Sequence, residues 1–153
     1  MVEGILDLKT EDLGEKCRRL RQQVLDYHYK TQISHVGGSL SCVEILAALY
    51  YDVMNQEDTF ILSKGHASST LYVILHDKGK LPSNDLYSLE EHPTLNKQFG
   101  IESTTGSLGH GLSIGLGMAL AERNHTCYVL LSDGECDEGQ VWEAANLASQ
   151  KGM

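Results

Sequence analysis

Apolar residues recur along this chain with two different periods, which predict alternating helices and strands. Spacings of three and four residues predict a helix over residues 10–31. The apolar stripe of this helix consists of Leu13, Cys17, Leu20, Val24 and Tyr27. We expect its arginines to form a solvated face, made of Arg18, Arg19 and Arg21.

Two short β-rich runs, residues 59–63 and 125–132, predict buried parallel strands. Helices are expected over residues 41–54, 67–77, 84–91, 109–122 and 138–150. The first of these begins with an S-x-x-E capping box, Ser41 with Glu44. Residues 33–39 and 94–107 are expected to be loops. Because strands alternate with helices, the predicted fold class is α/β, with an open parallel sheet flanked by helices.

Composition narrows the possible functions. The chain has 153 residues with a formal charge of −9, which predicts one globular domain without a broad nucleic-acid or acidic-membrane surface. The four cysteines include no C-x-x-C pair, so we expect reduced, mostly buried thiols in a cytoplasmic protein. The acidic N-terminus does not resemble a secretory signal peptide, and no apolar run reaches the ~18 residues of a membrane span.

Both predicted strands end in polar, glycine-containing loops, at the strand ends where parallel sheets bind ligands. Asp133 follows the second strand and could hold a hard cation such as Mg²⁺. Gly134 would let a phosphate approach the backbone closely. The alternative is that Asp133 is only a turn residue, since Asp-Gly turns are common.

Four of the seven histidines fall in loops marked by glycine or proline: His35, His66, His92 and His110. Imidazoles in such loops suit proton transfer near neutral pH or anion binding. The alternatives are unrelated surface histidines or a zinc site, which their spacing does not favour. The glycines near residue 110 fail the dinucleotide-binding frame because Ile114 stands at its third glycine. A phosphate-binding P-loop and a G-x-S-x-G elbow are absent from the sequence.

Five segments taken together resemble the N-terminal, diphosphate-binding domain of transketolases. They are residues 33–41, 60–67, 91–93, 103–113 and 131–144. They occur in family order and span nearly the whole chain, from about Leu13 to Met153. The resemblance implies a thiamine diphosphate-binding fold that uses thiamine diphosphate and Mg²⁺. It also implies transfer of a two-carbon ketol unit from a ketose to an aldose, as in pentose phosphate metabolism.

The resemblance implies cofactor-binding roles for particular residues. Asp133 corresponds to a magnesium ligand, with Gly134 beside the diphosphate. His66 and Gly106 correspond to contacts on the diphosphate side. Leu108 would lie against the aminopyrimidine ring.

The remaining implied roles concern the substrate and a partner chain. His35, His66 and His92 would bind sugar hydroxyls and move protons. His110 lies beside the cofactor segment, where the family commonly has glutamine. Glu138 resembles a glutamate that faces the partner chain near the cofactor, although stabilising a helix dipole would equally explain it.

Three features depart from the family pattern. Ser132 stands where the family has glycine, and the loop between Met54 and Phe60 is short. An asparagine that completes the magnesium site is expected about one βα unit beyond Gly134, which is past Met153. We therefore expect residues 1–153 to be a single, truncated diphosphate-binding domain in a homo- or hetero-oligomer, with a partner chain supplying the pyrimidine domain. The alternatives are a deoxyxylulose-phosphate-synthase-like enzyme or a non-catalytic α/β remnant that serves in assembly.

Overall fold

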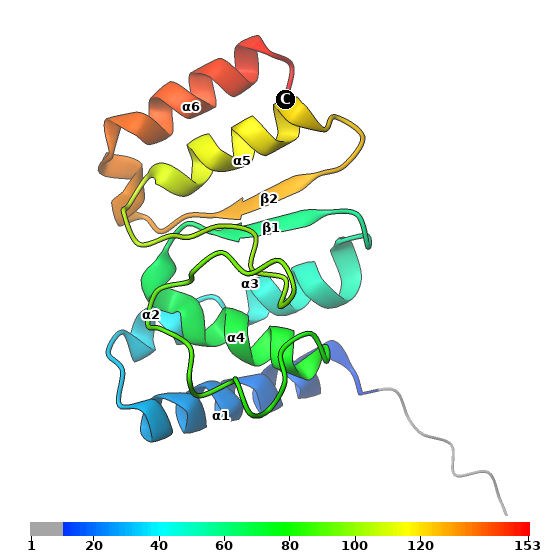
Figure 1. Cartoon of the computed structure of the whole chain (residues 1–153), viewed down its shortest axis with the longest axis vertical. Helices are drawn as coiled ribbons and strands as arrows, with labels where there is room; N and C mark the ends of the chain where they lie inside the picture. The colour runs from blue at the N-terminus through cyan, green and yellow to red at the C-terminus, as the bar shows by residue number, and fades with distance from the viewer. Residues whose placement is uncertain (1–10) are drawn as a thin grey trace, which may run out of the picture.

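The computed structural model describes residues 11–153 (Figure 1). Its helices are α1 (Leu13–Thr31), α2 (Val36–Leu40), α3 (Val43–Ala48), α4 (Ser68–Asp77), α5 (His110–Ala121) and α6 (Gly139–Gln150). There are also three shorter helical segments. One is π-helical, η1 (Leu49–Val53), and two are 3₁₀ turns, η2 (Gly65–Ala67) and η3 (Gly134–Asp137). Thr10 and the N-terminal segment used in the signal-peptide argument lie outside the described residues.

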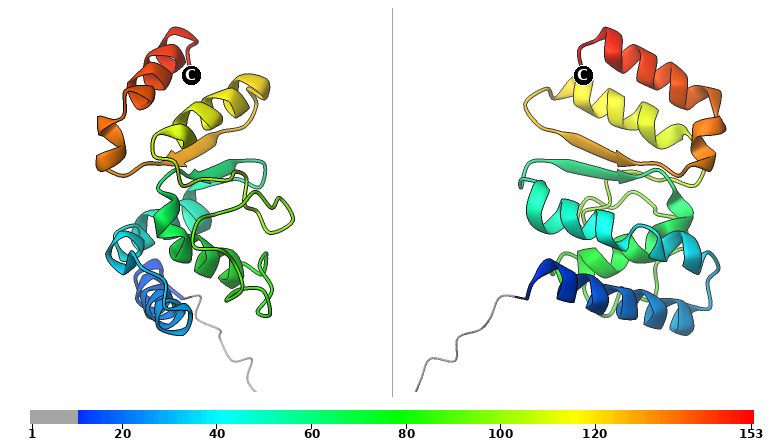
Figure 2. Two further views of the ribbon diagram at one scale, coloured as in Figure 1. Left: turned by 60° about the vertical axis from the view of Figure 1, so that its left-hand side comes forward. Right: turned by 180° about the vertical axis from the view of Figure 1, so that it is seen from behind.

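The sheet of the described residues has two parallel strands, β1 (Thr59–Leu62) and β2 (Cys127–Leu130). Thr59 lies opposite Cys127 and Leu62 opposite Leu130. Helices α5 and α6 lie on one side of this pair, and α1, α3 and α4 lie on the other (Figures 1 and 2). The predicted α/β class with a parallel sheet flanked by helices is therefore confirmed. Because the strands are parallel, their carboxyl ends meet at one edge.

The main core lies between β1 and the helices α1, α3 and α4. All residues from 68 to 75 on α4 are buried, so this helix is covered on every side. The predicted stripe of α1 faces it, with Leu20, Val24 and Tyr27 fully buried. Periodic apolar positions therefore became the core, as amphipathic patterning requires.

Helix α5 lies very close to the sheet because two of its glycines have no side chain. A Cβ atom on Gly111 would lie 2.4 Å from Ser63 Oγ, and one on Gly115 would lie 2.4 Å from Val129 Cγ2. Both distances are far below a van der Waals contact, so any larger residue would push the helix away. The two glycines therefore set how closely α5 packs against the sheet.

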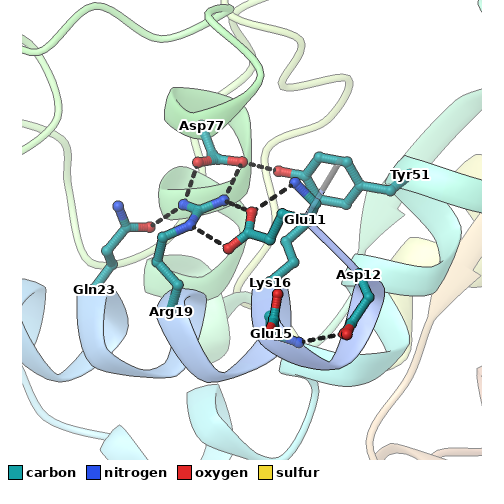
Figure 3. A network of polar contacts seen from close by, with 8 residues as sticks. All are labelled: Glu11, Asp12, Glu15, Lys16, Arg19, Gln23, Tyr51 and Asp77. Carbon is teal, nitrogen blue, oxygen red and sulfur yellow. Dashed lines mark hydrogen bonds and ion pairs between the residues drawn. The ribbon is translucent and has the colours of Figure 1, made fainter. Parts of the chain in front are cut away.

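The arginine face predicted for the first helix is not simply solvated. Arg19 binds both the Glu11 and Asp77 carboxylates, and Asp77 also accepts a hydrogen bond from Tyr51 (Figure 3). Arg21 Nη1 donates to Glu44 Oε1 at 2.9 Å. These contacts join α1 to α3, α4 and the η1 turn. Glu44 and Asp77 lie 23 and 58 residues from their arginines in the chain, so spacing within the helix could not predict these two partners.

The prediction of a capping box at Ser41 and Glu44 is wrong. Ser41 Oγ donates to the Gly38 carbonyl at 2.8 Å, and Glu44 pairs with Arg21. Residues 36–39, predicted as loop, belong to α2, and Cys42 precedes α3 without a side-chain cap. The single predicted helix over residues 41–54 is therefore a short helix followed by a π-turn.

The helix predicted over residues 84–91 is absent, and turns replace it. Side chains of α4 bind its backbone carbonyls instead: Tyr72 Oη donates to Glu90 O at 3.0 Å, and Ser68 Oγ donates to Glu91 O. At the end of such a helix these carbonyls would have no intrahelical partner, so the two bonds fix the end of the segment to α4 and do not by themselves exclude a helix.

One smaller prediction is also modified. The four cysteines are free, but only Cys17 and Cys42 are buried. Trp142 is 65% exposed, with Nε1 donating to Cys136 O at 2.7 Å. Within residues 11–153, every helix is too short or too polar to cross a membrane.

Candidate functional site

The loop histidines gather at the carboxyl end of β1. His66 lies on η2, directly after the strand, and the His35 ring lies 5.2 Å from it between centroids. His35 has a backbone φ of 65°, in the left-handed region that non-glycine residues seldom adopt. An uncommon conformation kept at a cluster of chemically active side chains is typical of functional sites.

The environment of His66 favours its neutral form. Burial lowers the pKa of His66, and the nearby positive charges of Lys64, His35 and His92 lower it further, while Glu135 opposes them. Lys64 itself is buried and donates from Nζ to Ser41 Oγ at 3.2 Å. A neutral imidazole can accept a proton or a hydrogen bond near neutral pH.

His92 lies in the long connection between α4 and α5. A Cβ atom on Gly106 would lie 3.1 Å from His92 Cδ2, so the two residues are in contact. Gly106 has a φ of 146°, which strongly favours glycine. Glu91 anchors this loop, since Ser34 Oγ donates to its Oε1 at 2.6 Å. That hydrogen bond, together with the positive charges of His35 and His92, lowers the pKa of Glu91. The structure thus brings His35, His66, His92 and Gly106 into one region.

Asp133 lies at the carboxyl end of β2 and is exposed. Within residues 11–153 its carboxylate makes no hydrogen bond or ion pair to the protein, and only its carbonyl oxygen binds the turn, accepting from Cys136 N at 3.0 Å. A Cβ atom on Gly134 would meet nothing within 4 Å. A free carboxylate beside open backbone fits a hard cation with a phosphate ligand.

The zinc alternative receives no support. Among residues 11–153, no three His, Cys, Asp or Glu side chains are placed to hold a metal ion together. One carboxylate with additional ligands from a bound phosphate remains compatible with Mg²⁺, which usually keeps few protein ligands. The donor set therefore fits Mg²⁺ better than zinc.

The segment before α5 contacts the loops that follow both strands. Leu108 is 39% exposed and His110 is exposed at the start of the helix. A Cβ atom on Gly109, between them, would lie 3.0 Å from Glu138 Cβ. Glu138 is exposed at the N-cap of α6 and makes no capping bond through its side chain. Leu108, His110 and Glu138 therefore lie near one another on the surface of the site.

Sequence reasoning missed Glu135, which is completely buried. Its carboxylate accepts hydrogen bonds from Ser63 Oγ at 2.6 Å, Gly109 N at 2.9 Å and Ser132 N at 2.8 Å. These three partners belong to the three loops that carry the predicted site. The only available signal was a glutamate directly after Asp-Gly, which is equally typical of an exposed turn.

A cavity of about 290 Å³ lies at the opposite, amino ends of the strands, where Thr59 and Cys127 line it. Three carboxylates, of Glu57, Glu102 and Glu122, also line this cavity. Lys97 and His125 line it as well, and since the three carboxylates outnumber these two groups the lining is poorly suited to an anionic diphosphate. None of the predicted site residues lines it.

Comparison with known proteins agrees with this geometry. The family described as transketolase, thiamine diphosphate binding domain, matches residues 15–153. The chain is 38% identical to one subunit of the apulose-4-phosphate transketolase of Phocaeicola vulgatus, over 94% of this chain and 58% of the relative. It is 41% identical to a 6-deoxy-6-sulfo-D-fructose transketolase subunit of a Clostridium species, over 90% of this chain and 57% of the relative.

A human transketolase is 33% identical over 92% of this chain and 26% of its own length. The chain thus spans somewhat over half the length of the two bacterial subunits that it matches. The matched region contains every segment on which the resemblance was based. This chain belongs to the family of transketolase thiamine diphosphate binding domains.

Proposed function

We propose that this chain supplies the diphosphate-binding part of a transketolase. The enzyme would transfer a two-carbon ketol unit from a ketose to an aldose, with thiamine diphosphate and Mg²⁺. The observation that carries the proposal is the free Asp133 carboxylate at the same sheet edge as the contacting His35 and His66 rings. Sugar phosphates of the pentose phosphate type are the substrates that we propose.

Several residues would hold the cofactor. Asp133 would bind Mg²⁺, and Gly134 and Gly106 would leave room for the diphosphate. His66 would contact the diphosphate, and Leu108 would pack against the pyrimidine ring with His110 beside it. When bound, thiamine diphosphate supplies a thiazolium ring that stabilises a carbanion.

The histidines would bind the sugar substrate and exchange protons with it. His35, His66 and His92 carry ring nitrogens that can donate hydrogen bonds to hydroxyl groups or accept protons from them. The lowered pKa of His66 keeps its ring neutral near pH 7, so that it can act as a proton acceptor. Backbone and ring donors at this edge would also stabilise negative charge that develops on oxygen.

A partner chain is part of the proposal. Within residues 11–153, β2 pairs only with β1 and all four of its residues are partly exposed. Three of the bacterial relatives are themselves named as transketolase subunits. We propose that a second chain brings the pyrimidine domain into a homo- or hetero-oligomer and meets Glu138.

We also propose that residues 1–153 belong to a single, partial diphosphate-binding domain and that the protein is cytoplasmic. Its four free cysteines suit a reducing compartment. The deoxyxylulose-phosphate-synthase-like alternative is less well supported, because the matching family and relatives are transketolases.

Isothermal titration with thiamine diphosphate and Mg²⁺ tests the proposal, first with the chain alone and then with a candidate pyrimidine-domain partner. We expect binding that requires Mg²⁺ and becomes tighter when the partner is present. A coupled assay with a ketose donor and an aldose acceptor should then detect ketol transfer by the complex. Absence of binding with the partner present would refute a catalytic role, and release of CO₂ from pyruvate would favour the synthase alternative.

A further inference from the structure

The buried carboxylate of Glu135 joins three separate parts of the chain. Its Oε1 atom accepts from Ser63 Oγ, at the end of β1, and from Gly109 N, before α5. Its Oε2 atom accepts from Ser132 N, after β2, at 2.8 Å. Ser63 and Gly109 lie 72 and 26 residues away from Glu135 in the chain. The carboxylate therefore links loops that no local structure would connect.

The geometry requires an acceptor with two oxygens. Both backbone N–H groups and the serine hydroxyl point to the same small volume, and Glu135 is 0% exposed. Without the carboxylate these donors would lose their buried partner, and an unpaired buried donor is strongly unfavourable. No ion pair involving Glu135 exists among residues 11–153, so hydrogen bonds alone offset its burial.

Ser63 extends the connection to α5. Gly111 N donates to Ser63 Oγ at 3.2 Å, and the same hydroxyl donates to Glu135. A Cβ atom on Gly111 would collide with Ser63, so the helix lies closer to the end of β1 than any residue larger than glycine would allow. The first turn of α5 is thus fixed to the end of β1 through one hydroxyl and one carboxylate.

We infer that Glu135 is a positioning residue, whose carboxylate holds the loops bearing His66, Leu108 and Asp133 in the arrangement that binds the diphosphate cofactor. This inference rests on the proposed function. Ser63 lies three residues before His66, Gly109 follows Leu108, and Ser132 precedes Asp133. Glu135 would act through these neighbours, without touching cofactor or substrate itself. Groups that orient ligands in this way typically change metal affinity or activity by about 10- to 100-fold when mutated.

The test compares two carboxylate-to-amide substitutions, Glu135→Gln and Asp77→Asn, in the chain assembled with its partner. Asp77 is the matched control because its carboxylate also joins distant elements, α1, η1 and α4 (Figure 3). It is the last residue of α4, whereas the η2 turn with His66 precedes the first residue of that helix. Affinity for thiamine diphosphate with Mg²⁺ is measured by titration at a temperature where both variants are folded. We expect Glu135→Gln to weaken binding about 10-fold or more. Asp77→Asn should change it less than about two-fold, as expected for a distant site.

If Glu135 only stabilised the fold, as Asp77 does, both substitutions would lower stability. Neither would then weaken cofactor binding more than the other at a temperature where both variants are folded. Equal affinities for Glu135→Gln and Asp77→Asn would therefore overturn the inference. If Glu135→Gln does not fold, Ser63→Ala takes its place, because it removes one donor and keeps the carboxylate. Unchanged affinity in Ser63→Ala would also overturn the inference, and a loss confined to that variant would support it.

Hydrogen exchange separates this inference from the proposed function. In Glu135→Gln the Gly109 and Ser132 amide protons should exchange faster, while amides of α4 keep their protection. If the wild-type complex does not bind the cofactor, the proposed function fails, and the exchange data alone decide whether Glu135 holds the loops. Unchanged exchange at both amides would overturn that remaining part.

Discussion

The two sides of the sheet differ in how completely they are covered. On the side of α1, α3 and α4, which we term the closed half, residues 68–75 are all buried. On the side of α5 and α6, which with β2 we term the open half, the only buried positions of α5 are Gly111, Gly115 and Leu116. The four residues of β2 are each partly exposed, whereas three of the four in β1 are buried.

This difference separates the main core from the part of the candidate site that carries Asp133, whereas His35 and His66 lie beside α2 and α4 on the side of the closed half. Burial of large apolar side chains is the main source of folding free energy, and it is concentrated in the closed half. The open half exposes Ile114, Trp142 and Leu147 and carries the free Asp133 carboxylate. Substitutions in the two halves should therefore affect different measurements.

The largest expected effect on stability is in the closed half. Leu75→Ala removes a side chain that is 0% exposed, which should lower the free energy of unfolding by about 2–5 kcal/mol. Leu147→Ala, at a position that is 42% exposed on α6, should change it by less than about 0.5 kcal/mol. Urea denaturation measures both. Equal losses would show that the two halves are equally important for stability.

Asp133→Asn should affect binding alone. Loss of the charge that would hold Mg²⁺ is expected to weaken thiamine diphosphate binding roughly 100-fold, or about 2.7 kcal/mol. The urea midpoint should stay unchanged, because the exposed carboxylate bonds to no described residue of the protein. Asp137→Asn, an exposed neighbour on η3, is the control and should bind normally. An equal loss in both variants would point to net charge in place of a specific ligand.

Close packing in the open half can be tested with two glycines of the same helix. Gly115→Ala places a Cβ 2.4 Å from Val129 Cγ2, and overpacking of this kind costs about 1–3 kcal/mol. Gly117→Ala meets nothing within 4 Å and should stabilise the helix by about 0.5–1 kcal/mol. Thermal denaturation of the two variants should shift in opposite directions. Shifts of the same sign would mean that α5 can move away from the sheet.

The smallest effect concerns pH and the ionic network of the closed half. Hydrogen bonding to Arg19 lowers the pKa of Glu11 from 4.5 to about 2. A carboxyl whose folded pKa is depressed contributes stability above its unfolded pKa and loses it as pH falls through the folded value. Stability should therefore decline between about pH 4.5 and 2, and Glu11→Gln should flatten this part of the profile. Melting temperatures measured across that range provide the test, and identical slopes would contradict it.

Much of the fold follows from local patterns. The apolar stripe of α1, the β-rich runs of β1 and β2 and the small residues of α5 each predict their own element, because side-chain period and size act within a short segment. The alternation of strands and helices predicts the parallel sheet, and strand-end loops predict where His66 and Asp133 lie. The five motifs and their order along the chain were sufficient to identify the family.

Contacts between distant segments could be decided only by the tertiary structure. The turn segment of residues 84–91 is joined to α4 because Ser68 and Tyr72 bind its last two carbonyls, and Arg19 is paired because Asp77 approaches from another helix. Glu135 looks like a turn residue in the sequence, yet folding buries it among donors from three loops. A hydrogen bond depends on positions in space, and only the packed chain determines which remote donors reach a given acceptor.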